Sequence, residues 1–226
     1  MNKDAHELKA TDTVGISFWT ISVALVATTV FLVLERNEVG EKWKLPISIS
    51  ALVTGIAAMH YLYMRKVWVD KQISPVAYRY IDWFLTVPLQ ICEFYLVLSV
   101  DEDVPVSFLY TMLSASFIMI LFGFLGETGR VSKTVGFVGG MAAWGYIIYE
   151  IFLGTGAKFE QKSKNPSVKL AYNAMKWIVT VGWAIYPLGY VLEAEQMNMV
   201  YNLGDFVNKI LFTGMIWYAA ETDVTR

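Results

Sequence analysis

The stretch VYNLGDFVNKILFTGMIWYAA, residues 200–220, is long and apolar enough to cross a membrane, and yet it contains a lysine near its middle. A bilayer core is crossed by a helix of about 20 apolar residues. A charged lysine at that depth is costly unless it is paired or neutralised. Asp205 precedes Lys209 by one helical turn and can act as its counter-charge, and a lysine amine can form an imine with an aldehyde. The pair therefore predicts a helical membrane bundle with a covalently attached carbonyl chromophore.

The overall composition agrees with a membrane protein. The chain has 226 residues, of which 56% are hydrophobic and 17% are charged, against about 45–50% and about 25% in soluble domains. A net charge of −2 argues against nucleic-acid binding. The single cysteine, Cys92, cannot form an internal disulfide, and its apolar surroundings indicate a small packing residue.

Seven apolar segments are long enough to span a bilayer, so we expect an all-α, seven-transmembrane-helix bundle forming one domain over residues 1–226. The expected spans are residues 14–34, 46–64, 76–100, 104–125, 132–153, 172–192 and 200–220. Short polar connections separate them, at residues 37–44, 66–74, 101–103, 126–130, 154–165 and 193–198, which favours antiparallel packing of neighbours. A β-barrel is a poor alternative, because the apolar runs are continuous rather than alternating.

The orientation follows weakly from the basic residues. With seven spans the two termini lie on opposite sides. The side of the C-terminus collects eight basic residues and the side of the N-terminus seven, which favours a cytoplasmic C-terminus and an extracellular N-terminus. The first set is Arg36, Lys42, Lys44, Lys158, Lys162, Lys164, Lys169 and Arg226, and the second is Lys3, Lys9, Arg65, Lys66, Lys71, Arg130 and Lys133. Residues 1–10 do not resemble a secretory signal.

The third expected span carries charged residues in an ordered stripe. Asp82 and Glu93 are eleven residues apart, so on a helix they lie within about 20° of each other and about 16 Å apart along the axis. Arg79 lies one turn before Asp82, and Thr86 lies one turn after it.

Two interpretations of this stripe are open. The acids could be structural ties between helices or could face a polar gap. Alternatively they form a proton relay, because Arg79 favours the ionised form of Asp82, whereas the apolar surroundings of Glu93 favour its protonated form. One carboxylate that accepts a proton and one carboxylic acid that supplies one are what a vectorial pump needs.

Several motifs together resemble the microbial (type 1) rhodopsins over nearly the whole chain. Within that family the chain is most similar to the proteorhodopsins of marine bacteria. The motifs are Arg79-Tyr-Ile-Asp-Trp, Thr86-Val-Pro, Ile91-Cys-Glu-Phe-Tyr, Trp183-Ala-Ile-Tyr-Pro and Tyr201-Asn-Leu-Gly-Asp-Phe-Val-Asn-Lys.

The resemblance implies a role for each charged residue. Lys209 would bind all-trans retinal as a protonated Schiff base. Asp82 would be its primary counterion and proton acceptor, Asp205 the second counterion, and Arg79 the residue that orders this complex. Glu93 would be the proton donor on the cytoplasmic side. The triplet of Asp82, Thr86 and Glu93 matches outward proton pumps, since chloride and sodium pumps differ in it and sensory members usually lack the second carboxyl group.

Retinal is an apolar polyene and needs flat walls. Trp83, Trp183 and Tyr186 are aromatic and could clamp it, and Pro187 could kink the sixth span. The family's pattern adds further pocket residues, which could otherwise be ordinary packing residues: Met119, Gly123 and Phe137.

His60 and Gln90 complete the candidate site. His60 could be a packing residue, but the resemblance implies that it pairs with Asp82, contributes to subunit contacts and makes pumping sensitive to pH. Gln90 would reach toward the retinal, and a glutamine rather than a leucine at this position is associated in the family with blue absorption. We therefore expect a blue-absorbing pigment. Glu150 is interpreted as an interfacial residue near a helix end, and Glu193 and Glu195 receive no role.

The sequence thus predicts a light-driven outward proton pump rather than an enzyme, in a bacterial inner membrane, with lipid and protons as partners and a homo-oligomer of five or six copies. No metal site is expected. The first alternative is a photosensor with a slow photocycle that signals to a membrane partner. The second is a seven-helix carrier or receptor in which Lys209 and Asp205 form a structural ion pair.

Overall fold

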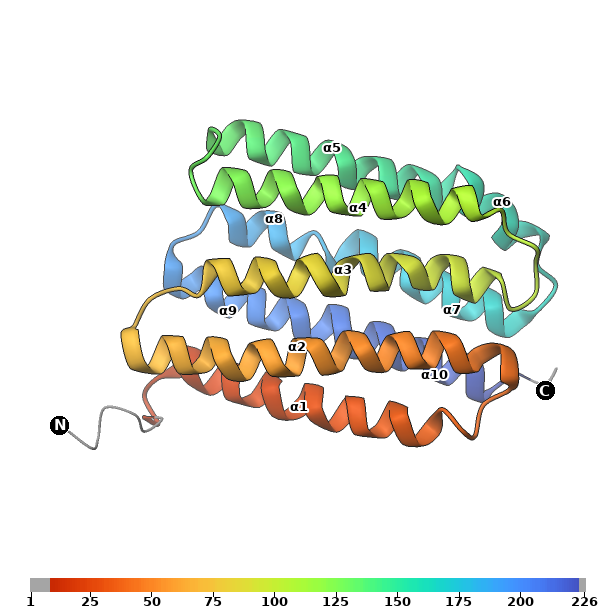
Figure 1. Cartoon of the computed structure of the whole chain (residues 1–226), viewed down its shortest axis with the longest axis horizontal. Coiled ribbons are helices and arrows are strands. Elements are labelled where there is room, and N and C mark those ends of the chain that lie inside the picture. The colour runs from red at the N-terminus through yellow and green to blue at the C-terminus, as the bar shows by residue number, and fades with distance from the viewer. Residues whose placement is uncertain (1–8, 224–226) are drawn as a thin grey trace.

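The computed structural model describes residues 9–223, and these form an all-helical bundle without strands (Figure 1). The predictions on Lys3 and Arg226, and most of residues 1–10, lie outside the described part. The first five spans are α1 (Thr13–Glu35), α2 (Lys44–Lys71), α3 (Val76–Leu98), α4 (Val106–Glu127) and α5 (Lys133–Phe152). A 3-10 turn, η2 (Glu41–Trp43), precedes α2, and a short helix, α6 (Thr155–Lys162), follows α5.

The sixth and seventh spans are each interrupted by a π-helical turn. The sixth consists of α7 (Pro166–Trp177), the π turn η3 (Ile178–Gly182) and α8 (Ile185–Tyr190). The seventh consists of α9 (Ala194–Asp205), the π turn η4 (Phe206–Leu211) and α10 (Phe212–Glu221). Within the described chain, five helices taken singly are long and apolar enough to cross a membrane. The other two crossings are assembled from these shorter pieces, so the expected seven-span fold is confirmed.

Several helices extend beyond the apolar segments that predicted them. Helix α2 continues to Lys71, where Gln72 takes a left-handed conformation with a φ of 54° and ends it. The sixth span begins at Pro166 rather than at residue 172, because Asn165 caps it and proline suits a first helical position. The expected connections 154–165 and 193–198 are largely helical. Hydropathy marks only the part of a helix inside lipid, whereas capping residues decide where the helix ends.

Helix α3 lies in the middle of the bundle, between the layer of α4 and α5 and the layer of α1 and α2 (Figure 1). Of the five long helices it buries the largest share of its apolar window. This position explains why its polar residues are tolerated, since Arg79, Asp82 and Glu93 are all buried inside the protein rather than exposed to lipid. By contrast, Phe117 and Leu121 of α4 are exposed, as expected for a lipid-facing surface.

At the end of the bundle where α10 ends (Figure 1), hydrogen bonds between side chains and backbone join four segments. Asp223 accepts hydrogen bonds from Trp43 Nε1 at 2.7 Å and from Asn165 Nδ2 at 3.0 Å. Asp101, in the α3–α4 connection, accepts from Ser163 Oγ at 2.8 Å and from the backbone N–H of Asn165 at 3.1 Å. These bonds hold the starts of α2 and α7 against the ends of α3 and α10.

The Asp101 carboxylate gives the fold a predictable dependence on pH. Burial alone would raise the pKa of Asp101, but its hydrogen bonds and the charge of Lys42 lower this pKa below its usual value. A group whose pKa is lower in the folded state stabilises the fold above its unfolded pKa, near 4, and loses that effect as the pH falls through its folded pKa.

We expect Asp101→Asn to lower the thermal midpoint at pH 7 by about 2–4 °C, corresponding to roughly 1 kcal/mol for a charge-assisted but exposed site. The difference from wild type should shrink below about pH 4. Thermal unfolding at several pH values checks this, with Asp103→Asn in the same exposed connection as the control. A difference that stays constant down to pH 3 would contradict the role of the Asp101 charge.

Candidate functional site

Lys209 lies on the π turn η4 and is 1% exposed, with two carboxylates as its partners. Its Nζ hydrogen bonds to Asp82 Oδ2 of α3 at 2.5 Å and to Asp205 Oδ2 of its own span at 3.1 Å. Both aspartates are fully buried. A buried cation is tolerated only when paired in this way, so the three residues form one charged unit inside the helical bundle.

Asp205 is held by three aromatic side chains. Tyr61 of α2 donates to its Oδ2 at 2.7 Å, and Tyr186 of α8 donates to its Oδ1 at 2.7 Å. The indole Nε1 of Trp83 lies 3.4 Å from the same Oδ1. These donors stabilise a carboxylate and fix its orientation, so Asp205 is the more firmly anchored of the two acids.

Arg79 completes the charge balance but does not contact Asp82 through a hydrogen bond. Its guanidinium donates to Tyr61 Oη at 3.1 Å, to Asn198 Oδ1 at 3.1 Å and to Asn202 Oδ1 at 2.9 Å. The spacing along α3 predicted that Arg79 lies beside Asp82. In the structure the Arg79 side chain instead points toward α9. Two cations and two carboxylates leave the cluster with no net charge, which suits a low-dielectric site.

The second carboxylate oxygen of Asp82, Oδ1, faces His60 of α2. His60 Nδ1 lies 3.8 Å from Asp82 Oδ1 and 3.0 Å from the carbonyl oxygen of Ile56. Within residues 9–223, Oδ1 has no hydrogen-bond partner. Thr86 Oγ1 donates to the backbone carbonyl of Asp82 at 2.9 Å. One oxygen of Asp82 therefore pairs with Lys209 while the other keeps its capacity to accept.

Glu93 also lies on α3, closer than Asp82 to the C-terminal end of that helix. It is fully buried, and its Oε1 accepts a hydrogen bond from Ser50 of α2. Its Oε2 has no hydrogen-bond partner in the described chain. Helical geometry separates Glu93 from Asp82 by about 16 Å along the axis. Glu93 thus lies far along the axis from the level at which Asp82 pairs with Lys209.

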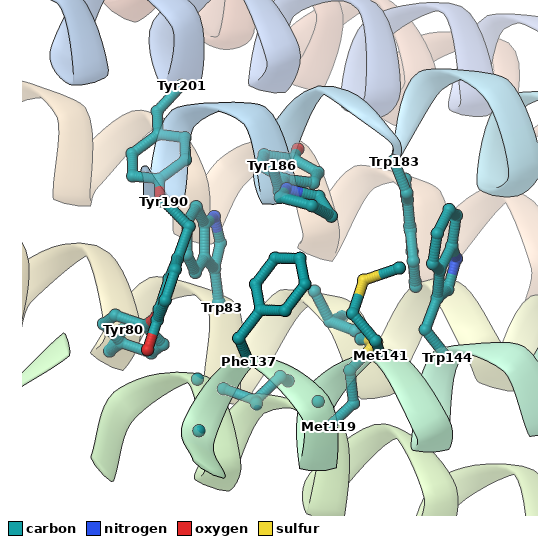
Figure 2. Close-up of a pocket in the computed structure, with 16 residues that line it drawn as sticks. Tyr80, Trp83, Met119, Phe137, Met141, Trp144, Trp183, Tyr186, Tyr190 and Tyr201 are labelled. Carbon is teal, nitrogen blue, oxygen red and sulfur yellow. The ribbon is translucent and has the colours of Figure 1, made fainter. Parts of the chain in front are cut away.

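An aromatic cavity lies between α3, α4, α5 and the sixth span, and its mostly apolar lining is typical of sites that bind small molecules. Figure 2 shows Trp183 and Tyr186 facing Met119, Phe137 and Met141 across it. The full lining is Tyr80, Trp83, Val87, Met119, Ile120, Gly123, Gly136, Phe137, Gly140, Met141, Trp144, Trp183, Tyr186, Pro187, Tyr190 and Tyr201. The cavity includes seven residues predicted from the sequence: Trp83, Met119, Gly123, Phe137, Trp183, Tyr186 and Pro187.

Two of these walls connect the cavity to the charged cluster. Trp83 and Tyr186 line the cavity and also contact Asp205 through their polar atoms. Gly123 keeps another wall open, since a Cβ there would lie 3.0 Å from Tyr80 Oη. The cavity therefore shares two of its walls with the charged cluster around Lys209, and its aromatic lining suits a flat apolar molecule.

Two predicted residues have surroundings that differ from the expectation. Gln90 does not line the cavity, and its Nε2 instead donates to the backbone carbonyl of Asn208 at 2.6 Å. Glu150 lies two residues before the end of α5, where an interfacial residue was expected, but its side chain is buried by the protein. It accepts from Tyr146 Oη at 3.0 Å and from the N–H of Thr155 at 2.9 Å, so it holds the start of α6 against α5.

Several polar residues of the site were not predicted from the sequence: Ser50, Tyr61, Asn198, Asn202 and Asn208. Asn198, Asn202 and Asn208 precede Lys209 in the last span, and three asparagines in one crossing were a signal that could have been used. Ser50 and Tyr61 are common in apolar helices, and only the packing of α2 against α3 and α9 reveals their partners.

A family model described as bacteriorhodopsin-like protein matches residues 12–223. The chain belongs to this family. Among its relatives, the blue-light absorbing proteorhodopsin of Gamma-proteobacterium Hot 75m4 is 47% identical over 223 residues, which cover 95% of this chain and 88% of that protein. The green-light absorbing proteorhodopsin of Gamma-proteobacterium EBAC31A08 is also 47% identical, over 95% of this chain and 89% of that protein.

Solved structures of the family agree with the fold. The crystal structure of blue light-absorbing proteorhodopsin from Med12 has a TM-score of 0.82 and 46% identity, over 92% of this chain and 98% of that one. The crystal structure of Exiguobacterium sibiricum rhodopsin has a TM-score of 0.83 and 29% identity, over 92% and 96%. Since blue- and green-absorbing relatives are equally similar, overall identity does not decide the colour, and particular residues must.

Proposed function

We propose that this protein is a light-driven outward proton pump that carries retinal on Lys209. The observation that supports it best is the division of labour between two buried acids on α3. Asp82 pairs with the Lys209 amine, whereas Glu93 is remote from that cluster and bonds to the uncharged Ser50. Membership of the bacteriorhodopsin-like family, with proteorhodopsins as near relatives, supports the same function.

The residues present fit a retinal molecule. The cavity is lined by flat aromatic and methionine side chains, and Trp83, Trp183 and Tyr186 would hold a polyene. The Nζ of Lys209, held beside Asp82 and Asp205, would supply the linking nitrogen. When bound, retinal would absorb visible light and isomerise, which changes the direction and the proton affinity of the group at that nitrogen.

The chain's own residues would then move the proton. Asp82 accepts it from the nitrogen at Lys209, because its Oδ2 is within hydrogen-bond distance. Asp205 keeps its negative charge through its aromatic donors and holds the lysine in place. Arg79, with Asn198 and Asn202, provides polar groups between this cluster and the end of the bundle where α9 begins.

Glu93 would refill the site from the other side. Its protonated form suits a buried position with a hydroxyl neighbour. With the C-terminus in the cytoplasm, Glu93 lies on the cytoplasmic side of Lys209 and Arg79 on the extracellular side, so the net movement is outward. We place the protein in a bacterial plasma membrane and expect a pentamer or hexamer, in which His60 of α2 near Asp82 would link proton affinity to subunit contacts.

Glu93→Gln tests the donor and separates the pump from a photosensor. The amide cannot supply a proton, so return of the proton to Lys209 should slow by about 10²–10⁴-fold, the usual effect of a proton-transfer group. Flash-resolved absorbance measures this step, and azide, a small diffusible acid, should restore the speed. Glu102→Gln, in the α3–α4 connection, is the matched control. An unchanged rate would favour the sensor.

Gln90→Leu tests the assignment of colour. A polar amide near Lys209 favours the ground state, whose positive charge is concentrated at the linking nitrogen, and this widens the gap to the more delocalised excited state. Removing the amide should shift the absorption maximum to the red. Gln196→Leu, exposed on α9, should leave the spectrum unchanged. If Gln90→Leu causes no red shift, the prediction of a blue-absorbing pigment is wrong.

A further inference from the structure

The two π-helical turns, η3 in the sixth span and η4 in the seventh, are joined by the side chain of Asn208. We propose that Asn208, together with Gln90 and Gly182, forms a clamp that holds the third, sixth and seventh spans together in the dark state and limits the rate of the photocycle. Asn208 is then a positioning residue next to Lys209. The proposal rests on the proposed function, because it assigns the clamp to that pigment.

The first link of the clamp satisfies a carbonyl group that the sixth span leaves without a helical donor. The N–H of Tyr186, which would bond to the Gly182 carbonyl in an α-helix, instead donates to the backbone carbonyl of Trp183 at 3.1 Å. Pro187, five residues after Gly182, has no N–H to make a π-helical bond. Asn208 Nδ2 donates to this carbonyl at 2.9 Å. The seventh span thus supplies the donor that the sixth lacks.

The second link repeats this arrangement in the seventh span. The N–H of Phe212, the α-helical partner of the Asn208 carbonyl, is directed to the Lys209 carbonyl. Gln90 Nε2 of α3 donates to the Asn208 carbonyl at 2.6 Å. Each π turn therefore exposes one carbonyl group, and each carbonyl is satisfied by an amide from a neighbouring span.

The contact between the spans leaves no room for a larger residue at position 182 while Asn208 keeps its place. A Cβ on residue 182 would lie 1.9 Å from Asn208 Oδ1. Asn208 is fully buried, and its Oδ1 has no hydrogen-bond partner among residues 9–223. The amide is therefore held in place by its Nδ2 bond and by the flat surface of Gly182.

The clamp lies where movement would begin. Asn208 is adjacent to Lys209, and Gly182 is adjacent to Trp183 in the wall of the cavity. Any movement of the sixth span away from the seventh must break the Asn208–Gly182 bond, and a buried carbonyl without a donor is unfavourable. The clamp therefore opposes this movement and slows the steps that need it.

The test is Asn208→Ala in the full-length pigment, with Asn173→Ala on α7 as the control, since Asn173 bonds within its own span and to α6. Losing one buried hydrogen bond should speed recovery of the dark absorbance after a flash by about 2- to 10-fold. The thermal midpoint should also fall. An unchanged or slower recovery would overturn the proposal, even if stability falls, because Asn208 would then be structural only.

A second variant separates the rate from stability. Pro187→Ala restores an N–H at residue 187, which can make a π-helical bond to the Gly182 carbonyl. In that background this carbonyl no longer depends on Asn208, so Asn208→Ala should no longer lower the thermal midpoint. Recovery should remain fast in the double variant, because no side chain joins the two π turns. A midpoint that falls as much as in the single variant would contradict the assigned bond.

The recovery rates are measured by absorbance and do not depend on proton transport. A pigment that shows the predicted rates but moves no protons would therefore contradict the proposed function and still support the clamp.

Discussion

Lys209→Ala is expected to give a protein that stays colourless after all-trans retinal is added and that moves no protons in light. The amine is the only group of the charged cluster that can form an imine with an aldehyde, and it lies beside the aromatic cavity through Trp83 and Tyr186. Removing it also leaves Asp82 and Asp205 buried without their shared cation, so the protein should be less stable as well.

Lys209→Arg is the matched control for charge. It keeps a cation at the same place but cannot form the imine. It should therefore also be colourless, while it loses less stability than Lys209→Ala. Absorbance after addition of retinal and thermal unfolding measure the two effects. A coloured Lys209→Ala protein would show that retinal is attached elsewhere or is not needed.

Asp82→Asn is expected to keep the pigment and abolish pumping. Lys209 and the cavity remain, so colour should form, but an amide cannot accept the proton from the nitrogen at Lys209. Proton transfer should slow by about 10²–10⁴-fold, and light-driven acidification should disappear. The absorption maximum should move to the red, because a negative charge next to the chromophore is lost. Asp103→Asn, exposed in the α3–α4 connection, should pump like the wild type.

The same reasoning predicts how wild-type pumping depends on pH. Asp82 must be ionised before each cycle, so pumping should fail as the medium becomes acid enough to protonate it, and at that point the spectrum should approach that of Asp82→Asn. Titrating absorbance and transport together checks this. If Asp82→Asn pumps at the wild-type rate at alkaline pH, then Asp82 is not the acceptor.

Much of the fold and the charged part of the site could be predicted from the sequence. Charges inside apolar segments are costly, so Lys209, Asp205, Asp82 and Glu93 stood out, and their helical spacing placed them in order. The structure brings Lys209 and both aspartates together as expected. Long apolar segments predicted the seven spans. The helices extend beyond these segments, because capping residues such as Asn165 determine where they begin and end.

The remaining features depend on packing between spans, which spacing along one helix does not reveal. Arg79 was expected beside Asp82, but the asparagines of α9 draw it the other way. Gln90 was expected at the retinal, but the π turn at Lys209 exposes a carbonyl group that binds it. π turns have no clear sequence pattern, so neither the exposed carbonyl groups nor the role of Asn208 could be anticipated.

Outward proton movement can be measured as the pH of an unbuffered suspension of cells that contain the protein and retinal, illuminated at alkaline pH. We expect the medium to become more acidic in light and to recover in darkness. A protonophore or the Asp82→Asn substitution should abolish the change. A pigmented protein that leaves the pH unchanged, or makes the medium more alkaline, would contradict an outward proton pump.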